Sequence, residues 1–121
     1  MGLNDFQKAL LKDVVHVARS ATGVIYYSKL GALHGITGDD EFNYNRLAGE
    51  LGTITEYEHE AGRPLISVVV VRKDDKMPGL GFFKLAKALG VMKHSVKPWE
   101  NRVEFFAAEH KKTVKYWRKS K

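Results

Sequence analysis

One run of apolar residues constrains the fold of this chain more than any other feature. Residues 65–71 read Leu-Ile-Ser-Val-Val-Val-Val, and four consecutive β-branched valines favour an extended backbone. The run does not alternate between apolar and polar residues, so both of its faces need cover from other elements. We therefore predict a strand buried on both faces, followed by a charged turn at residues 72–76.

Helical patterns flank this strand on both sides. The first helix is expected to begin at Asn4, with Gln7 three residues later at the spacing of a capping box. Its apolar face is expected to hold Phe6, Leu10, Val14 and Val17. Further helices are expected from Ser28, as the cap, to Leu33, over about 43–61, over 82–89 and over 99–118.

The order of these elements predicts the fold class. The chain has 121 residues, which fits one domain. We expect a core over about residues 4–90, a connector at 91–98 and the C-terminal helix at 99–118. Three helices, a strand, a turn and a strand-like return predict an α+β, winged-helix-like domain whose wing is the turn at 72–76.

Composition narrows the classes of protein to consider. The chain has no cysteine, which excludes a disulfide scaffold, a thiolate zinc site, an iron–sulfur cluster and a cysteine nucleophile. No apolar stretch approaches the ~20 residues of a membrane span, and the N-terminus lacks the pattern of a secretory signal. We expect a cytoplasmic protein that has neither a cofactor nor a membrane partner.

Charge is the main indication of function. The net charge is +6, but residues 1–83 hold 9 basic and 11 acidic side chains, whereas residues 84–121 hold 11 basic and 3 acidic ones. The positive charge therefore belongs to the last third of the chain. Such asymmetry indicates an anionic partner, and we expect nucleic acid, DNA rather than RNA. A solvated lysine-rich surface would show the same pattern.

The last helix separates an apolar stripe from a cationic face. On a helical wheel the expected core stripe comprises Trp99, Val103, Phe106, His110, Val114 and Trp117. The expected phosphate contacts are Lys111, Lys115 and Arg118, with Lys112 beside them. Cations near a helix C-terminus also complement the helix dipole, which is a structural reason for the same pattern.

Two other segments offer nucleic-acid contacts. Asn45 and Arg46 stand in the first turns of the third helix and suit base edges or phosphates, whereas the glutamates that follow them would repel a phosphate backbone. Arg72 and Lys73 of the turn can reach a backbone or a minor groove.

Two alternative functions remain open. One is a phage or mobile-element module that docks on a host protein through Phe105, Tyr116 and the acidic stretch Asp39-Asp40-Glu41. The two rings would otherwise pack on the connector. The other is a metal-dependent nuclease that uses Asp74, Lys76 and a glutamate, although this spacing is common by chance. No pattern indicates a catalytic residue more directly, so an enzyme is not expected.

Several short motifs resemble a group of small bacterial and phage proteins that carries no established activity. The motifs are Tyr27-Ser28-x-Leu30, Leu51-Gly52-x-Ile54-x-x-Tyr57-Glu58, Gly62-Arg63-Pro64-Leu65-Ile66-Ser67, Val70-Val71-Arg72-Lys73, Met77-Pro78-Gly79-x-Gly81-Phe82-Phe83 and Tyr116-Trp117. More distantly, the order of elements is similar to the winged-helix half of alkyltransferase-like DNA-binding proteins. Their reactive Pro-Cys-His-Arg motif is absent because this chain lacks cysteine. The resemblance implies a fold and DNA binding, and no catalytic residue.

Overall fold

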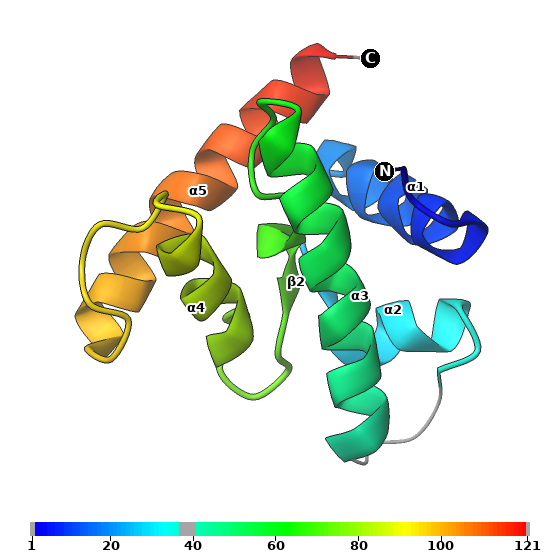
Figure 1. The fold of residues 1–121 in the computed structure, drawn as a ribbon, viewed down its shortest axis with the longest axis horizontal. Coiled ribbons are helices and arrows are strands. Elements are labelled where there is room, and N and C mark those ends of the chain that lie inside the picture. Colours follow the sequence, from blue (N-terminus) through cyan, green and yellow to red (C-terminus); the bar gives the residue numbers. More distant parts are fainter. Residues whose placement is uncertain (1, 37–40, 121) are drawn as a thin grey trace.

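The computed structural model describes residues 2–36 and 41–120 (Figure 1). In order, its elements are α1 (Asp5–Arg19), β1 (Ile25–Tyr26), α2 (Tyr27–Leu33), α3 (Glu41–Glu60), the 3₁₀ helix η1 (Ile66–Val69), β2 (Val70–Val71), α4 (Leu80–Ala88) and α5 (Trp99–Lys119). In Figure 1, α4 and α5 lie on one side of β2, α1 and α2 lie on the other, and α3 runs between them. The α+β class is confirmed, with helices dominant over a sheet of two strands.

The apolar run is buried as predicted, but most of it is not a strand. Every residue from Leu65 to Val71 is buried. Only Val70 and Val71 form β2, which pairs in parallel with Ile25 and Tyr26 of β1. Because β1 offers only two residues to pair with, η1 satisfies backbone groups through local bonds such as the one that the Val68 N–H donates to the Leu65 carbonyl (3.1 Å). The predicted seven-residue strand is therefore wrong in length.

The first helix follows its sequence pattern closely. The Asn4 side chain accepts a hydrogen bond from the Gln7 N–H (2.8 Å), and the Gln7 side chain accepts one from the Asn4 N–H (3.0 Å). Leu10 and Val14 are fully buried. The predicted capping box and apolar face are confirmed. In contrast, α2 begins at Tyr27 and has no side-chain cap, so the cap predicted at Ser28 is absent.

Helix α3 buries one carboxylate together with its apolar stripe. Leu47, Leu51 and Ile54 are buried as predicted, and the next residue on that stripe is Glu58. Arg63 donates two hydrogen bonds to the Glu58 carboxylate, at 2.9 and 2.7 Å. This paired geometry compensates the buried charge and fixes the turn that leads into the apolar run.

The charged turn does not form the predicted wing. The Arg72 N–H donates to the Met77 carbonyl (2.8 Å) and the Lys76 N–H donates to the Arg72 carbonyl (3.0 Å), so the turn closes on itself. Residues 77–79 then lead directly into α4 without a returning strand. The two strands of the described chain are parallel, so the turn at 72–76 does not connect the antiparallel hairpin that a wing requires.

Helix α5 has the predicted length, but its buried face only partly matches the predicted stripe. Phe106, His110, Val114 and Trp117 of that stripe are half-buried. Trp99 and Val103, assigned to the core stripe, are 46% and 40% exposed, whereas Glu109 and Thr113 are buried. The Glu109 carboxylate accepts a hydrogen bond from the Leu65 N–H (2.9 Å) at the start of the apolar run. That backbone donor has to be satisfied inside the core, and this requirement turns α5 toward Glu109.

Candidate nucleic-acid interface

The structure brings three of the predicted phosphate contacts into one groove. Lys111, Lys115 and Arg118 line one wall of a groove of about 620 Å³, together with Lys119. The facing wall is the loop at residues 21–23 between α1 and β1. We call this feature the basic groove. Residues 110–119 include five cations and no acidic side chain.

Hydrogen bonds from side chains of α5 to backbone carbonyls of the facing segment hold the two walls together. The His110 Nε2 donates to the Gly23 carbonyl (2.8 Å), and the Arg118 guanidinium donates to the Ser20 carbonyl (2.6 Å). Gly23 adopts a φ of +67°, and a Cβ there would lie 3.2 Å from both His110 and Val114. Only glycine combines this left-handed conformation with such a close approach, so the loop is fixed against α5.

A second arginine ties α1 to the end of α5. Arg19 donates to the Trp117 carbonyl (2.9 Å) and to the Ser120 carbonyl (2.9 Å), and its guanidinium lies 5.6 Å from the Trp117 ring centre. Trp117 lies in the last turn of α5 and Ser120 is its C-cap, and carbonyls at this end of a helix lack backbone N–H donors. Arg19 therefore orders the segment that carries the cations of the basic groove.

Lys112 lies outside the basic groove. Its ammonium is 3.9 Å from the buried Glu109 carboxylate, and it lines a small hollow beside Arg63 and Pro64. The helical wheel placed Lys112 next to the other cations, but Glu109 lies one turn before it on the same helix, on the side away from the basic groove.

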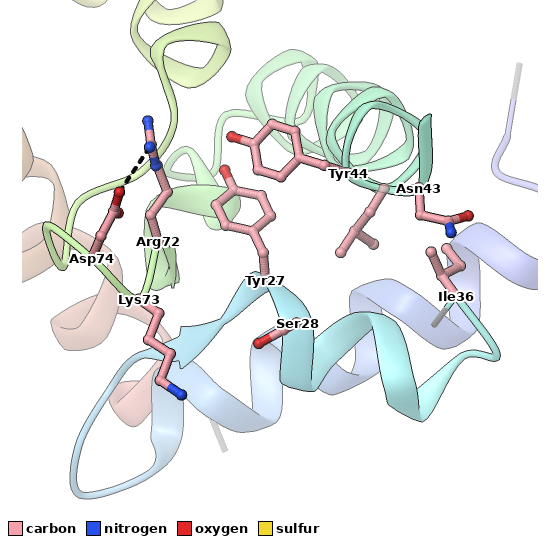
Figure 2. A pocket seen from close by; sticks show the side chains of 9 residues that line it. Tyr27, Ser28, Ile36, Asn43, Tyr44, Arg72, Lys73 and Asp74 are labelled. Atoms are coloured by element: carbon pink, nitrogen blue, oxygen red, sulfur yellow. Dashed lines mark hydrogen bonds and ion pairs between the residues drawn. The ribbon is translucent and has the colours of Figure 1, made fainter. Parts of the chain in front are cut away.

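Arg72 and Lys73 line a different pocket, of about 440 Å³, at the N-terminal end of α3 (Figure 2). The residues that share it include Tyr27, Ser28, Asn43 and Tyr44. We call this feature the turn pocket. The predicted contacts of the turn and of α5 thus belong to two separate hollows. The sequence pattern did not indicate that Tyr27 and Tyr44 form part of the turn pocket, apart from the Tyr27-Ser28 motif.

The two tyrosines are locked against the start of α4. Their rings lie 4.9 Å apart, and the Tyr27 hydroxyl accepts a hydrogen bond from the Gly79 N–H (3.3 Å). A Cβ at Gly79 would overlap the Tyr44 hydroxyl, which explains glycine at this position. Burial, and then the neighbouring Tyr44, raise the pKa of Tyr27 well above its ordinary value, so this phenol stays neutral.

The remaining predicted contacts lie on α3. Asn45 is exposed and lines a hollow between α3 and α4. Arg46 is exposed and its guanidinium lies 5.9 Å from the Phe6 ring centre. The structure does not place either residue in the basic groove. Glu50, counted as repulsive to phosphate, accepts a hydrogen bond from Gln7 (3.1 Å).

The aromatic residues predicted to bind a partner have separate environments. The Phe105 ring is half-buried and packs on Phe82 and Phe83, with centroids 6.1 and 6.4 Å apart. Tyr116 is exposed and contacts Trp117 edge to face. Asp39 and Asp40 lie outside the described residues, and Glu41 is exposed at the first position of α3.

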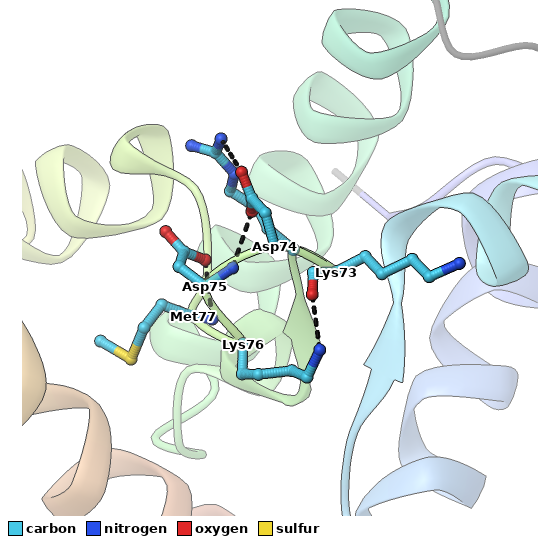
Figure 3. A network of polar contacts seen from close by, with 6 residues as sticks. Lys73, Asp74, Asp75, Lys76 and Met77 are labelled. Atoms are coloured by element: carbon cyan, nitrogen blue, oxygen red, sulfur yellow. Dashed lines mark hydrogen bonds and ion pairs between the residues drawn. The ribbon is translucent and has the colours of Figure 1, made fainter.

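The carboxylates of the charged turn serve the turn itself (Figure 3). Asp74 accepts hydrogen bonds from the Asp75 N–H (2.8 Å) and from Arg72 (3.0 Å), and these two donors hold the pKa of Asp74 below its usual value. Lys76 donates to the Lys73 carbonyl (2.6 Å). Within residues 2–36 and 41–120, no three histidine, aspartate or glutamate side chains gather as metal ligands.

No family model, no curated protein and no solved structure matches this chain. None of the helices in the described part of the chain is both long enough and apolar enough to cross a membrane. What this protein can bind is therefore inferred from the geometry of the basic groove and the turn pocket.

Proposed function

We propose that this protein is a non-enzymatic DNA-binding domain whose basic groove holds the phosphate backbone. The observation that carries the proposal is the row of Lys111, Lys115 and Arg118 along one wall of a groove. None of the described residues that line this groove is acidic. A surface of this kind attracts a polyanion and gains free energy by releasing counterions from it.

The spacing of the row suits a nucleic-acid strand. From Lys111 to Arg118 the helix rises by roughly 10 Å, at 1.5 Å per residue. Successive phosphates of one strand advance by about 3.4 Å along a duplex, so the row spans about three phosphates. The loop at 21–23 lies beside the row and lines the same groove. Its backbone N–H groups are further candidates for phosphate contacts, since such contacts are common in protein–DNA interfaces.

The proposal differs from standard winged-helix recognition. In that arrangement a recognition helix enters the major groove and a hairpin contacts the backbone. Here α5 supplies the phosphate contacts. Helix α3 offers only Asn45 and Arg46, which both lie near its N-terminal end. The proposal therefore requires no winged-helix arrangement of the domain.

Salt dependence tests the proposal. Fluorescence anisotropy of a labelled duplex is measured over a range of KCl concentrations. Four groove cations predict that log affinity falls with log salt at a slope of about −3 to −4, since each neutralised phosphate contributes about −0.9. An affinity that does not change with salt, or no binding at low salt, would contradict the proposal.

A further inference from the structure

The turn pocket has the size and chemistry of a site for a small anionic ligand with a flat body. Its volume of about 440 Å³ lies within the usual range for ligand pockets, roughly 300–1,000 Å³. Figure 2 shows Arg72 and Lys73 at one side, opposite Ile36 and Asn43, with the Tyr27 ring between them.

The aromatic part of the pocket is rigid. The hydroxyl of Tyr27 is held by the Gly79 N–H, and that of Tyr44 sits where a Gly79 side chain would be. The rings therefore keep their positions, 4.9 Å apart, and Leu47 lies beside them. Aromatic rings held in this way present a surface on which a planar base stacks at little entropic cost.

The charged part of the pocket favours an anion. Among the described residues, its lining has two cations, Arg72 and Lys73, and one acid, Asp74. The Arg72–Asp74 pair is largely exposed, so it contributes little stability and can open toward a ligand. The Lys73 side chain extends away from the turn and toward β1, as Figure 3 shows. The Arg72 guanidinium and the Lys73 ammonium point in opposite directions in Figure 2. A phosphate beside Lys73 would gain a charge-assisted hydrogen bond from its ammonium, and Arg72 adds positive charge at the other side of the pocket.

Strand β1 connects the turn pocket to the basic groove. Gly23 lines the groove, Tyr27 lines the pocket, and Ile25–Tyr26 forms β1 between them. Gly23 and Tyr27 are four residues apart, and even a fully extended chain of that length covers only roughly 13 Å, about the length of four stacked nucleotides of one strand. A strand that leaves the groove is therefore long enough, after a few nucleotides, to place one base in the pocket.

We propose that the turn pocket binds one unpaired nucleotide, with the base against Tyr27 and Tyr44 and the phosphate at Lys73. The neutral phenol of Tyr27 suits a base, because a phenolate would repel the adjacent phosphate. The nucleotide is either free or the end of a DNA strand. The second source rests on the proposed function, since the rest of that strand occupies the basic groove.

The first test uses mononucleotides and needs no DNA. Amide shifts in NMR spectra are followed during titration with AMP, with adenosine and with inorganic phosphate. AMP is expected to shift residues 27, 28 and 73, and to bind at least about tenfold more tightly than either fragment. No shift of these residues with AMP, or equal binding of inorganic phosphate, would overturn the proposal.

Matched variants locate the site. Lys73→Gln is expected to weaken AMP binding about tenfold, because a charge-assisted contact is lost. Lys29→Gln removes the same charge from an exposed position of α2 that does not line the pocket, and it is expected to bind AMP normally. Equal affinities of the two variants for AMP would show that AMP does not bind in the turn pocket and would overturn the proposal.

A final comparison distinguishes the two sources of the nucleotide. If the pocket takes a strand end, a duplex with a short single-stranded overhang binds more tightly than a blunt duplex, and Lys73→Gln removes this preference. Equal binding of the two duplexes, together with AMP binding, assigns the site to a free nucleotide. A chain that binds AMP but no duplex contradicts the proposed function alone, and one that binds duplexes but not AMP contradicts the pocket alone.

Discussion

At the scale of single residues, Glu109 stabilises the contact between α5 and the apolar run. Its buried carboxylate accepts the Leu65 N–H (2.9 Å) and faces Lys112 at 3.9 Å. Glu109→Ala leaves that N–H without a partner, so we expect the free energy of unfolding to fall by about 2–3 kcal/mol. Urea denaturation measures the change. Glu104→Ala, at an exposed position of the same helix, is the control and should change it by less than about 0.5 kcal/mol. A similar loss in both variants would contradict this role.

Gly79 and Tyr44 form a pair of complementary size at the turn pocket. A Cβ at Gly79 would overlap the Tyr44 hydroxyl, so Gly79→Ala is expected to cost about 1–3 kcal/mol of unfolding free energy. Removing the hydroxyl with Tyr44→Phe makes room, and the double variant should recover part of that loss. A double-mutant cycle measured by thermal unfolding checks this coupling. Additive effects of the two substitutions would show that the overlap is relieved in another way.

At the scale of elements, Arg19 of α1 controls the order of the last turn of α5. Its two hydrogen bonds end on the Trp117 and Ser120 carbonyls. Arg19→Ala is expected to speed amide exchange in residues 116–120 by roughly tenfold, since it removes charge-assisted bonds at a helix end. Hydrogen exchange followed by NMR measures this. Lys12→Ala, at an exposed position of α1, should leave the exchange rates of this turn unchanged.

The elements also show which parts of the fold are predictable from sequence. Local patterns were sufficient for α1, where Asn4 and Gln7 are three residues apart, and for the length of α5. They failed where the deciding partner is distant in sequence. The length of β2 depends on the two residues of β1, and the rotation of α5 depends on the Leu65 N–H. The spacing of apolar residues predicts which side chains are buried, but it does not predict backbone hydrogen bonds to distant segments. It therefore could not indicate the pairing with β1 or the bond from the Leu65 N–H.

At the scale of the whole molecule, the sequence shows that positive charge is concentrated in the last third of the chain. It does not show that the predicted contacts belong to two separate hollows. The row Lys111, Lys115 and Arg118 shares one face because a helix places residues four and seven positions apart together. The turn pocket joins Tyr27, Tyr44 and Arg72, which are far apart along the chain. Only the packing of α2 and α3 around β2 brings these residues to one place.

We propose that DNA binding depends on the basic groove and not on the net charge of +6. The most direct measurement compares two double variants of equal charge by anisotropy with a blunt duplex at one low salt concentration. Lys111→Gln/Lys115→Gln removes two cations from the basic groove, whereas Lys29→Gln/Lys84→Gln removes two exposed cations elsewhere. We expect the first variant to bind at least roughly tenfold more weakly than the second, with a salt slope smaller by about 1.8. Equal affinities and equal slopes would contradict the claim.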